Sequence, residues 1–255
     1  MPHIRVPYSN NRKHFAYMEL NKIKNADCLE YLKTLPDNCV DLVVTDPPYN
    51  VSQKSDIHYN GLNIVKNFGS WDFGFDPLPV LKELKRVLKH NGQIYVFCAT
   101  KQIPLYISFF EENSYFRNLI VWNKTNPPPR ISKTNFLFAN EYIVYAINEK
   151  VKMTETAFNF SKQNEMHNIF RTPSLQSRER LKDKNRKAIH PTQKPLSILK
   201  KLIEVSSYEG DVVLDPFMGV GSTAVACKEL GRNFLGCELD EKYIALANWR
   251  LENGE

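Results

Sequence analysis

The sequence predicts an α/β fold with a mostly parallel, doubly wound sheet, because strand-like and helix-like segments alternate along most of its 255 residues. Short apolar runs predict strands at 40–45, 93–98, 117–123, 141–147, 211–214 and 233–237. Helical patterns lie near 77–90, 101–112, 195–207, 222–231 and 241–252. Ligands of such sheets bind just beyond the carboxyl ends of the strands, so the residues that follow each strand are candidates for a functional site.

Two stretches interrupt this alternation. Residues 50–72 are polar, contain Gly61 and Gly69 and closely follow the first predicted strand, so we expect a mobile loop next to the active site. Residues 161–190 carry eight Lys or Arg and three acidic residues, a net charge of +5 in a chain whose total is +6. A charge run usually marks a solvated surface, but one that holds nearly the whole excess indicates contact with a polyanion.

The composition excludes several classes of protein. Hydrophobic residues make up 42% of the chain, enough for the core of a single domain over residues 1–255. The polar segment 1–20 does not resemble a signal peptide, and no apolar stretch approaches the ~20 residues of a membrane helix. The lack of such a stretch predicts no membrane partner, and five cysteines without a CxxC pair predict reduced thiols and a cytoplasmic location. Six histidines without ligand spacing predict no metal site.

The tetrapeptide Asp46-Pro47-Pro48-Tyr49 follows the strand predicted at 40–45. It combines a carboxylate, two prolines that stiffen the backbone and remove its donors, and an aromatic ring. Such a group can hold a flat ring that bears an amino group, although a Pro-rich turn that closes a strand would have the same composition. The tetrapeptide therefore needs support from the rest of the chain.

A second motif, residues 211–223, predicts a strand, a glycine turn and the start of a helix. Gly219 and Gly221 allow a sharp turn and close approach to a ligand, and Glu238 ends the next predicted strand, where a carboxylate can accept both hydroxyls of a ribose. The turn also fits the dinucleotide pattern G-x-G-x-x-A, but Asp215 at the strand end would repel a pyrophosphate. A cofactor with an ammonium or sulfonium group fits better, which favours S-adenosylmethionine over a nicotinamide.

Together the motifs resemble the amino-methyltransferases of bacterial restriction–modification systems. The resemblance rests on Asp-Pro-Pro-Tyr at 46–49, Asp-Pro-Phe-Met-Gly-Val-Gly-Ser at 215–222 and His-Pro-Thr-Gln-Lys-Pro at 190–195, and it extends from about Asn25 to Trp249. The catalytic motif precedes the cofactor motif, as in the family's beta group, whose order is circularly permuted. The resemblance implies a permuted, Rossmann-like S-adenosylmethionine-dependent methyltransferase fold, with a small irregular DNA-reading insertion that serves as the target-recognition region at 130–190.

The resemblance also implies roles for individual residues. Asp46 and the Pro47 carbonyl, with Pro48 in the same motif, would accept the N–H groups of the target amine, while Tyr49 would stack on the target base. Flipping a base out of a duplex costs a few kcal/mol and one stacking contact is worth roughly 1–3 kcal/mol, so a second aromatic is expected. Trp122 is the candidate for the target-base pocket, unless it is a core residue. The expected cofactor-binding residues are Asp27, Cys28, Thr192, Gln193, Lys194, Asp215, Phe217, Gly219, Gly221 and Glu238.

Simpler alternatives stay open for two of these residues, since Asp27 also suits a helix cap and Lys194 the start of a helix. The basic stretch, with the residues after the run of prolines at 127–129, is expected to bind double-stranded DNA. The expected DNA-binding residues are Arg130, Lys133, Arg171, Arg178, Arg180, Lys184, Arg186 and Lys187. The resemblance also allows a homodimer and a cognate restriction endonuclease that acts on the same site, in a bacterial or phage-encoded system.

These features predict a site-specific DNA adenine-N6 methyltransferase that acts on a flipped-out nucleotide. Asp46 favours adenine because the family's cytosine enzymes more frequently have Ser at that position. Cytosine N4 methylation uses the same amine chemistry and stays open, as do a non-catalytic DNA-binding subunit and an RNA substrate.

Overall fold

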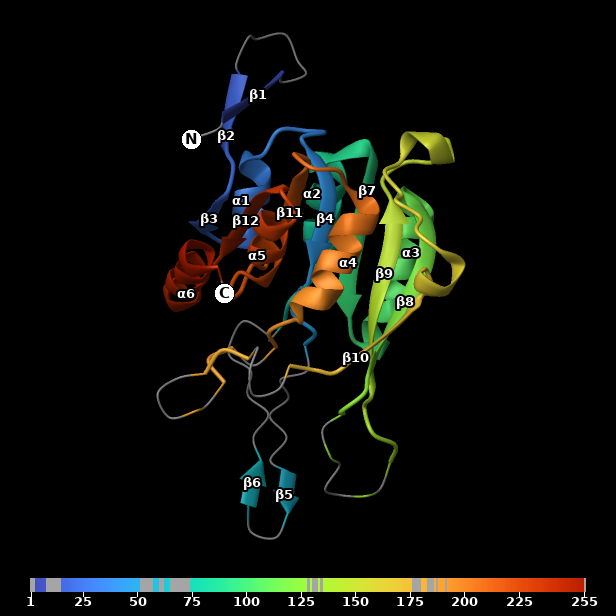
Figure 1. Ribbon diagram of the computed structural model, residues 1–255, viewed down its shortest axis with the longest axis vertical. Helices are drawn as coiled ribbons and strands as arrows, with labels where there is room; N and C mark the ends of the chain where they lie inside the picture. The colour runs from blue at the N-terminus through green and yellow to red at the C-terminus, as the bar shows by residue number, and fades with distance from the viewer. Residues whose placement is uncertain are drawn as a thin grey trace.

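An eight-stranded sheet forms the centre of the molecule, with its strands in the order β10-β8-β9-β7-β4-β11-β12-β3 (Figure 1). The computed structural model describes residues 3–7, 15–50, 57–59, 62–64, 74–127, 129, 133, 135–175, 180–182, 186, 188–190 and 192–254. The eight strands are β3 (Lys22–Asn25), β4 (Val40–Thr45), β7 (Leu88–Cys98), β8 (Tyr115–Lys124), β9 (Asn140–Ile147), β10 (Ile169–Thr172), β11 (Val212–Asp215) and β12 (Asn233–Glu238). Neighbouring strands are parallel except where β9 pairs with β7 and β8.

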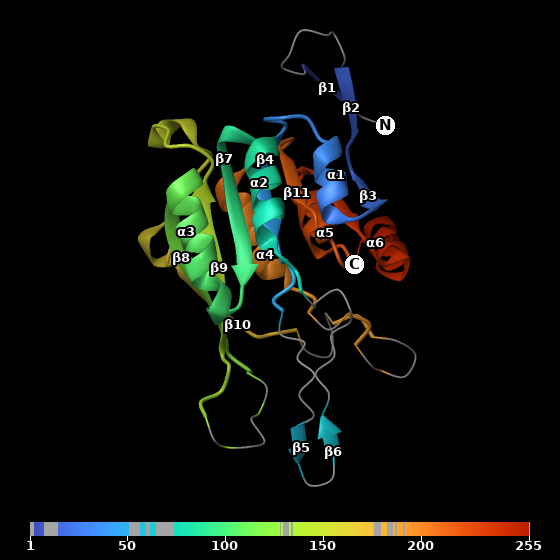
Figure 2. The ribbon, with the colours of Figure 1, turned by 180° about the vertical axis from the view of Figure 1, so that it is seen from behind.

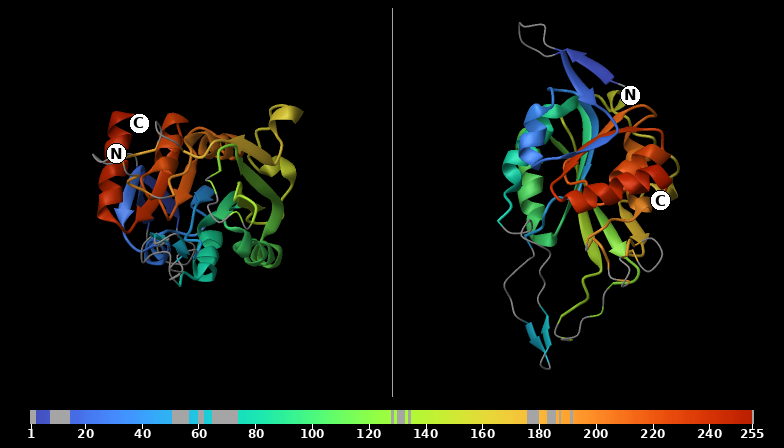
Figure 3. Two further views of the ribbon diagram at one scale, coloured as in Figure 1. Left: turned by 90° about the horizontal axis from the view of Figure 1, so that it is seen from below. Right: turned by 90° about the vertical axis from the view of Figure 1, so that its left-hand side faces the viewer.

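Helices cover both faces of this sheet, as the views from behind and along its edge show (Figures 2 and 3). The helices of one face are α1 (Cys28–Thr34), α2 (Pro77–Val87) and α3 (Ile103–Asn113). Those of the other face are α4 (Leu196–Ser206), α5 (Ser222–Glu229) and α6 (Glu241–Asn253). The predicted α/β class with a mostly parallel, doubly wound sheet is therefore confirmed.

The central strand β4 shows why its sequence is a continuous apolar run. Successive side chains of a strand point to opposite faces of a sheet, and here both faces are buried. Val43 packs into the hydrophobic core beneath α1, α2 and α3, while Val44 packs into the core beneath α4 and α5. A parallel strand that is covered on both sides needs apolar residues at nearly every position, which is what the sequence pattern indicated.

Helix α2 shows how the local sequence sets a helix. The Asp76 side chain accepts a 3.0 Å hydrogen bond from the Leu78 backbone N–H, and Pro77 occupies the first turn, where its missing N–H costs nothing. Its buried residues recur at the spacing of one helical face: Val80, Leu81, Leu84 and Val87. The cap and the apolar face together fix where this helix begins and how it packs on the sheet.

The six predicted strands correspond to β4, β7, β8, β9, β11 and β12, and the five predicted helices to α2 to α6. In the main sheet and the helices that cover it, the prediction missed β3, β10 and α1, which are four to seven residues long, too short for a clear periodic pattern. Three short 3₁₀ turns lie at Thr100–Gln102, Met153–Glu155 and Gln163–Glu165.

Two small antiparallel pairs lie outside the main sheet. One joins β1 (His3–Pro7) to β2 (Phe15–Glu19), and the other joins β5 (Ile57–Tyr59) to β6 (Leu62–Ile64). The prediction also missed the short strands of these two pairs. The second pair falls within the loop predicted at 50–72, and most of the rest of that loop lies outside the described residues, so its mobility stays a prediction. Among the described residues, no helix is long and apolar enough to cross a membrane.

Candidate active site

The two sequence motifs meet at the carboxyl edge of the sheet because β4 and β11 are parallel neighbours. Asp46 directly follows β4 and Asp215 ends β11, and the Thr45 hydroxyl donates a 2.9 Å hydrogen bond to Asp215 Oδ1. A pocket opens at this point. Its lining comes from both motifs and the 190–194 block, and includes Asp46, His190, Thr192, Gln193, Lys194, Asp215, Phe217 and Gly219.

Asp46 belongs to a row of alternating charges, in which Lys194 lies between Asp46 and Glu141 and Lys124 follows Glu141. Tyr49 Oη donates a 2.6 Å hydrogen bond to Asp46 Oδ1, and the Lys194 ammonium forms an ion pair with Oδ2. The same ammonium lies 3.5 Å from Glu141 Oε2, and the other Glu141 oxygen pairs with Lys124. Two carboxylates and two ammonium groups therefore balance one another beside the pocket, so Lys194, which is only 7% exposed, is buried with its charge compensated.

The charged groups in this row shift one another's pKa values. Burial raises the pKa of Asp46, and the neighbouring Lys194 opposes that shift without cancelling it. Burial would lower the pKa of Lys194, but Asp46 and Glu141 raise it above its ordinary value. Lys194 therefore stays protonated at neutral pH, and Asp46 is a carboxylate with an increased capacity to accept a proton.

Asp215 is more deeply buried than Asp46 and has different partners. It is 4% exposed and accepts hydrogen bonds from Thr45, from the Thr223 hydroxyl at 2.6 Å and from the Phe217 backbone N–H at 3.0 Å. Burial raises the pKa of Asp215 to about 6, although these three donors act in the opposite direction. Within the described part of the chain, no Lys or Arg forms an ion pair with it. Asp215 is therefore mostly ionised at pH 7 and presents an uncompensated negative charge to the pocket.

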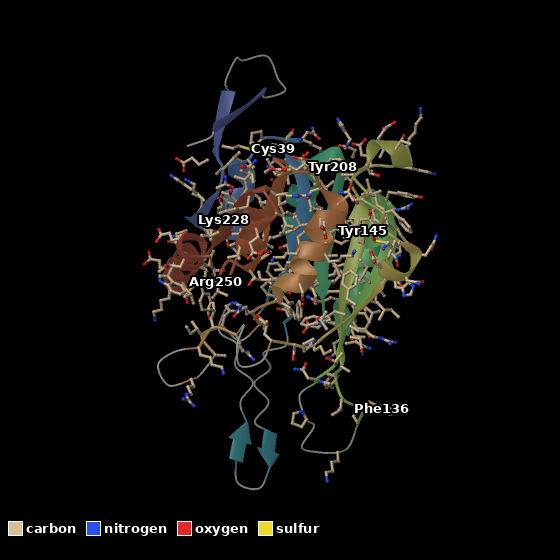
Figure 4. The ribbon with its side chains drawn as sticks, viewed as in Figure 1. Cys39, Phe136, Tyr145, Tyr208, Lys228 and Arg250 are labelled. Carbon is tan, nitrogen blue, oxygen red and sulfur yellow. The ribbon has the colours of Figure 1, made fainter. Side chains whose placement is uncertain are left out.

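The glycine turn after β11 is held from two sides. Gly219 has a φ of +52°, which favours glycine, and its N–H donates a 2.8 Å hydrogen bond to Glu238 Oε2 at the end of β12. Arg250 of α6, which Figure 4 labels, donates a 2.6 Å hydrogen bond to the Val220 carbonyl. Gly221 has a φ of +78°, and a Cβ there would lie 2.6 Å from the Ala247 side chain. Gly221 thus allows α6 to pack closely, and it is not among the residues that line the pocket.

The 190–194 block covers the glycine turn. The His190 ring lies 4.6 Å from the Tyr243 ring, centre to centre, and its Nε2 would be 3.2 Å from a Cβ on Gly219. Burial, together with the charges of Lys194 and Arg180, lowers the pKa of His190 to about 4, so the imidazole is neutral at pH 7. Gln193 Oε1 accepts a 3.1 Å hydrogen bond from the Leu181 N–H, which ties the block to the basic stretch.

Three predicted site residues have structural roles of their own. Trp122 is 3% exposed within the core under α4, and its indole N–H donates to the Thr172 carbonyl at 3.3 Å, so it does not line the pocket. Asp27 caps α1 by accepting from two backbone N–H groups, the alternative that its sequence position left open. Cys28 begins α1, and burial raises the pKa of its thiol to about 11. Their expected contacts with a base or cofactor stay predictions.

The expected DNA-binding residues are described only in part. Lys133, Arg171 and Arg186 are exposed, while Arg180 is partly buried near His190, whose pKa its charge lowers. Four of the predicted residues lie outside the described residues: Arg130, Arg178, Lys184 and Lys187.

Sequence reasoning missed the residues that support the two carboxylates. Glu141 begins a strand whose partners were unknown, and Thr45 is the last residue of β4 and resembles an ordinary β-branched strand residue. Thr223 in the first turn of α5 and His190 in the family block were visible in the sequence as polar residues next to a predicted site. These residues can be assigned to the site only from the structure, in which the ends of β4, β9 and β11 lie next to the pocket.

The family model described as DNA methylase (N6_N4_Mtase) matches residues 40–248. The chain belongs to this family. It is 36% identical over 248 residues to the Type II methyltransferase M.HinfI of Haemophilus influenzae, covering 91% of this chain and 68% of that protein. It is 29% identical over 242 residues to the Type II methyltransferase M2.MboI of Moraxella bovis, covering 89% and 86%.

Solved structures agree with this membership. The crystal structure of the M1.HpyAVI–SAM complex is 30% identical, with a TM-score of 0.66 over 90% of this chain and 98% of that one. The cytosine-N4-specific PvuII DNA methyltransferase has a TM-score of 0.67 over 90% of this chain and 87% of its own, but at 18% identity it is similar in fold only. The chain is therefore a DNA amino-methyltransferase of the restriction–modification family.

Proposed function

We propose that this protein transfers the methyl group of S-adenosylmethionine to the N6 amino group of adenine in double-stranded DNA. One observation carries the proposal: a pocket at the edge of the sheet contains a partly buried carboxylate, Asp46, which has a lysine partner, and a buried one, Asp215, which has no lysine or arginine partner among the described residues. A cationic methyl donor fits beside Asp215, and an amine acceptor fits beside Asp46.

The reaction needs no covalent intermediate with the protein. Asp46 and the Pro47 carbonyl accept hydrogen bonds from the two N–H groups of the target amine, and its lone pair then attacks the sulfonium methyl carbon. The C–N bond forms as the C–S bond breaks, which leaves a neutral thioether and a cationic amine. That amine loses one proton, and Asp46 is the proposed acceptor because burial raises its pKa.

The same pocket supports a proposed position for the cofactor. Asp215 would hold the ammonium end, with Phe217 and Gly219 along the methionine part. Glu238 already accepts N–H groups of Leu239 and Asp240 at Oε1 and of Gly219 at Oε2, and the lone pair that remains on Oε2 would accept a ribose hydroxyl. Lys194 would act from the Asp46 side of the pocket, since its ammonium bridges Asp46 and Glu141.

Adenine is preferred to cytosine because Asp46 begins the tetrapeptide, where the family's cytosine enzymes more often have Ser. The test is to incubate DNA with radiolabelled S-adenosylmethionine and digest it to nucleosides. We expect label in N6-methyladenine. Label in N4-methylcytosine alone would show that the protein methylates cytosine N4 and would contradict the proposed adenine target. Label in structured RNA but not in duplex DNA would move the activity to RNA.

Residues 130–190 are proposed to bind the DNA backbone. The protein is proposed to be a single-domain cytoplasmic enzyme, and its partners could include a second copy of the chain and a cognate endonuclease. If about five phosphates are contacted, log K should fall with log salt at a slope of roughly −4 to −5. Replacing exposed Arg171 by Gln should make that slope shallower by about 1. A slope near zero in the wild type would remove the basic stretch from the DNA interface.

A further inference from the structure

The connection between β8 and β9 carries an unusual exposed apolar segment. Phe136 is 91% exposed, and the next two residues, Leu137 and Phe138, are 49% and 67% exposed. Single exposed apolar side chains are common on protein surfaces, but three in succession at the end of a loop mark a contact surface. We call residues 136–138 the apolar tip.

The apolar tip lies on the same side of the molecule as the pocket. β8 runs parallel to β7 and β4, so the loop that follows it leaves from the carboxyl edge where Asp46 lies, and Figure 4 shows Phe136 well beyond that edge. The loop is also joined to the site, because Glu141 at its far end contacts Lys194, which pairs with Asp46. Phe136 lies five positions before Glu141, and a stretch of this length spans up to about 18 Å when extended, well over the ~8.5 Å depth of a DNA major groove.

The charges near the apolar tip favour a nucleic acid over a protein or lipid partner. Lys133 is exposed within the same loop, and Arg171 is exposed on β10, where it pairs in register with Asn123 near the end of β8. An aromatic ring flanked by cations suits a polyanion with stacked bases inside, since cations contact phosphates and aromatic side chains enter between base steps.

We propose that Phe136 enters the duplex beside the flipped nucleotide and stacks on the base left without its partner. This inference rests on the proposed function, because only an enzyme that flips a base creates such a gap. It also answers an energetic need: flipping costs a few kcal/mol, which one stacking contact on the target base offsets only in part, and Trp122 is buried and does not line the pocket. A stacking contact between Phe136 and the unpaired base, worth roughly 1–3 kcal/mol, would offset much of the flipping cost that stacking on the target base leaves uncompensated.

The test first maps the modified site in plasmid DNA that the wild-type protein has methylated. Two synthetic duplexes then carry this site, one with the target base paired normally and one with an abasic residue opposite the target. On the paired duplex, Phe136→Ala should be about 10-fold slower than wild type, corresponding to the loss of one stacking contact, while Phe136→Trp should keep most of the activity. On the abasic duplex, Phe136→Ala and wild type should have the same rate, because the orphan base is missing.

Phe160→Ala is the matched control. Phe160 is 53% exposed, and its neighbour Asn159 donates a hydrogen bond to the Val205 carbonyl at the end of α4, at the opposite edge of the sheet. This variant should match wild type on both duplexes. Equal rates of Phe136→Ala and wild type on the paired duplex would overturn the inference, as would the same deficit on both duplexes. If the wild type labels no DNA at all, the proposed function itself fails, and the role of Phe136 fails with it.

Discussion

Asp46 and Asp215 follow neighbouring strands and line one pocket, yet they are stabilised in different ways. Asp46 has an internal counter-ion, Lys194, which Glu141 and Lys124 hold in place. Asp215 accepts only hydrogen bonds from hydroxyl and backbone groups among the described residues, and the resulting pKa is about 6. A buried carboxylate without a neighbouring cation is unfavourable, which supports the proposal that a cationic ligand binds next to Asp215.

The contrast separates two tasks. The charge of Asp46 is already neutralised, so a neutral amine can approach it and leave a proton there. The charge of Asp215 is not neutralised, so a cation gains most by binding next to it. Changes at Asp46 should therefore affect turnover, and changes at Asp215 should affect cofactor affinity.

The largest effect is expected from Asp46→Ala. Turnover should fall by at least ~10³-fold, about 4 kcal/mol in the barrier, because the amine loses its hydrogen-bond acceptor and its proton acceptor. Radiolabel transfer to DNA measures the rate, and calorimetric titration with S-adenosylmethionine measures cofactor binding, which should survive. Equal activity in the variant and wild type would remove Asp46 from the chemistry, and loss of cofactor binding would mean that the two carboxylates share one task.

Asp215→Asn should have the opposite profile. The amide keeps the size of the side chain but loses the charge, so the Kd for S-adenosylmethionine should rise roughly 10- to 100-fold, a part of the interaction expected for a close charge pair. The rate at saturating cofactor should change much less. An unchanged Kd with a strongly reduced saturating rate would break the proposed division between the two carboxylates.

The pH dependence of cofactor affinity tests the same charge. The folded-state pKa of Asp215, about 6, is above its ordinary value of 3.8, so its negative charge is present above pH 6 and lost below it. Affinity for S-adenosylmethionine should fall by up to about 10-fold between pH 7 and pH 5, and Asp215→Asn should show a flat profile.

The raised pKa of Asp215 also affects the stability of the folded protein, but ionisation of Asp215 lowers this stability while it increases cofactor affinity. The folded protein binds the Asp215 proton more tightly than the unfolded chain, so the penalty of ionising Asp215 is absent below pH 3.8 and complete above pH 6. Asp215→Asn should therefore be more stable than wild type at pH 7, by on the order of 2 kcal/mol in denaturant unfolding, and this advantage should disappear near pH 4. A variant less stable than wild type at pH 7 would show that the hydrogen bonds outweigh the buried charge.

The smallest effect is expected from Glu141→Gln. Glu141 raises the pKa of both Lys194 and Asp46, so its neutralisation should move the acidic limb of the pH–rate profile to lower pH and reduce the rate only several-fold. Glu149→Gln, an exposed carboxylate of the turn after β9, is the control and should leave the profile unchanged. An unshifted acidic limb in Glu141→Gln would show that Glu141 has only a structural role and does not influence the protonation of Asp46.

The parts of the fold that could be predicted were those with strong local patterns. The apolar run of β4 and the capped, amphipathic α2 gave correct element types because burial on both faces and one-sided burial leave different periodicities. β10 could not be predicted because it is an edge strand of four residues with half-exposed side chains inside a basic stretch. The candidate site divides in the same way: Asp46 and Asp215 lie at ends of predictable strands, whereas Glu141 joins the site through an antiparallel strand whose position depends on distant pairing.

By itself the sequence determined the family, the permuted order of the two motifs and the kind of groups at the two strand ends, because these depend on residue type and local spacing. Only the tertiary structure decided which charges are paired. Lys194 lies 148 positions from Asp46 along the chain, and its ammonium reaches Asp46 and Glu141 because β4 and β9, with β7 between them, carry these carboxylates to the same edge of the sheet. Only the tertiary structure placed Trp122 in the core and Phe136 in solvent, since burial depends on which elements pack against a residue.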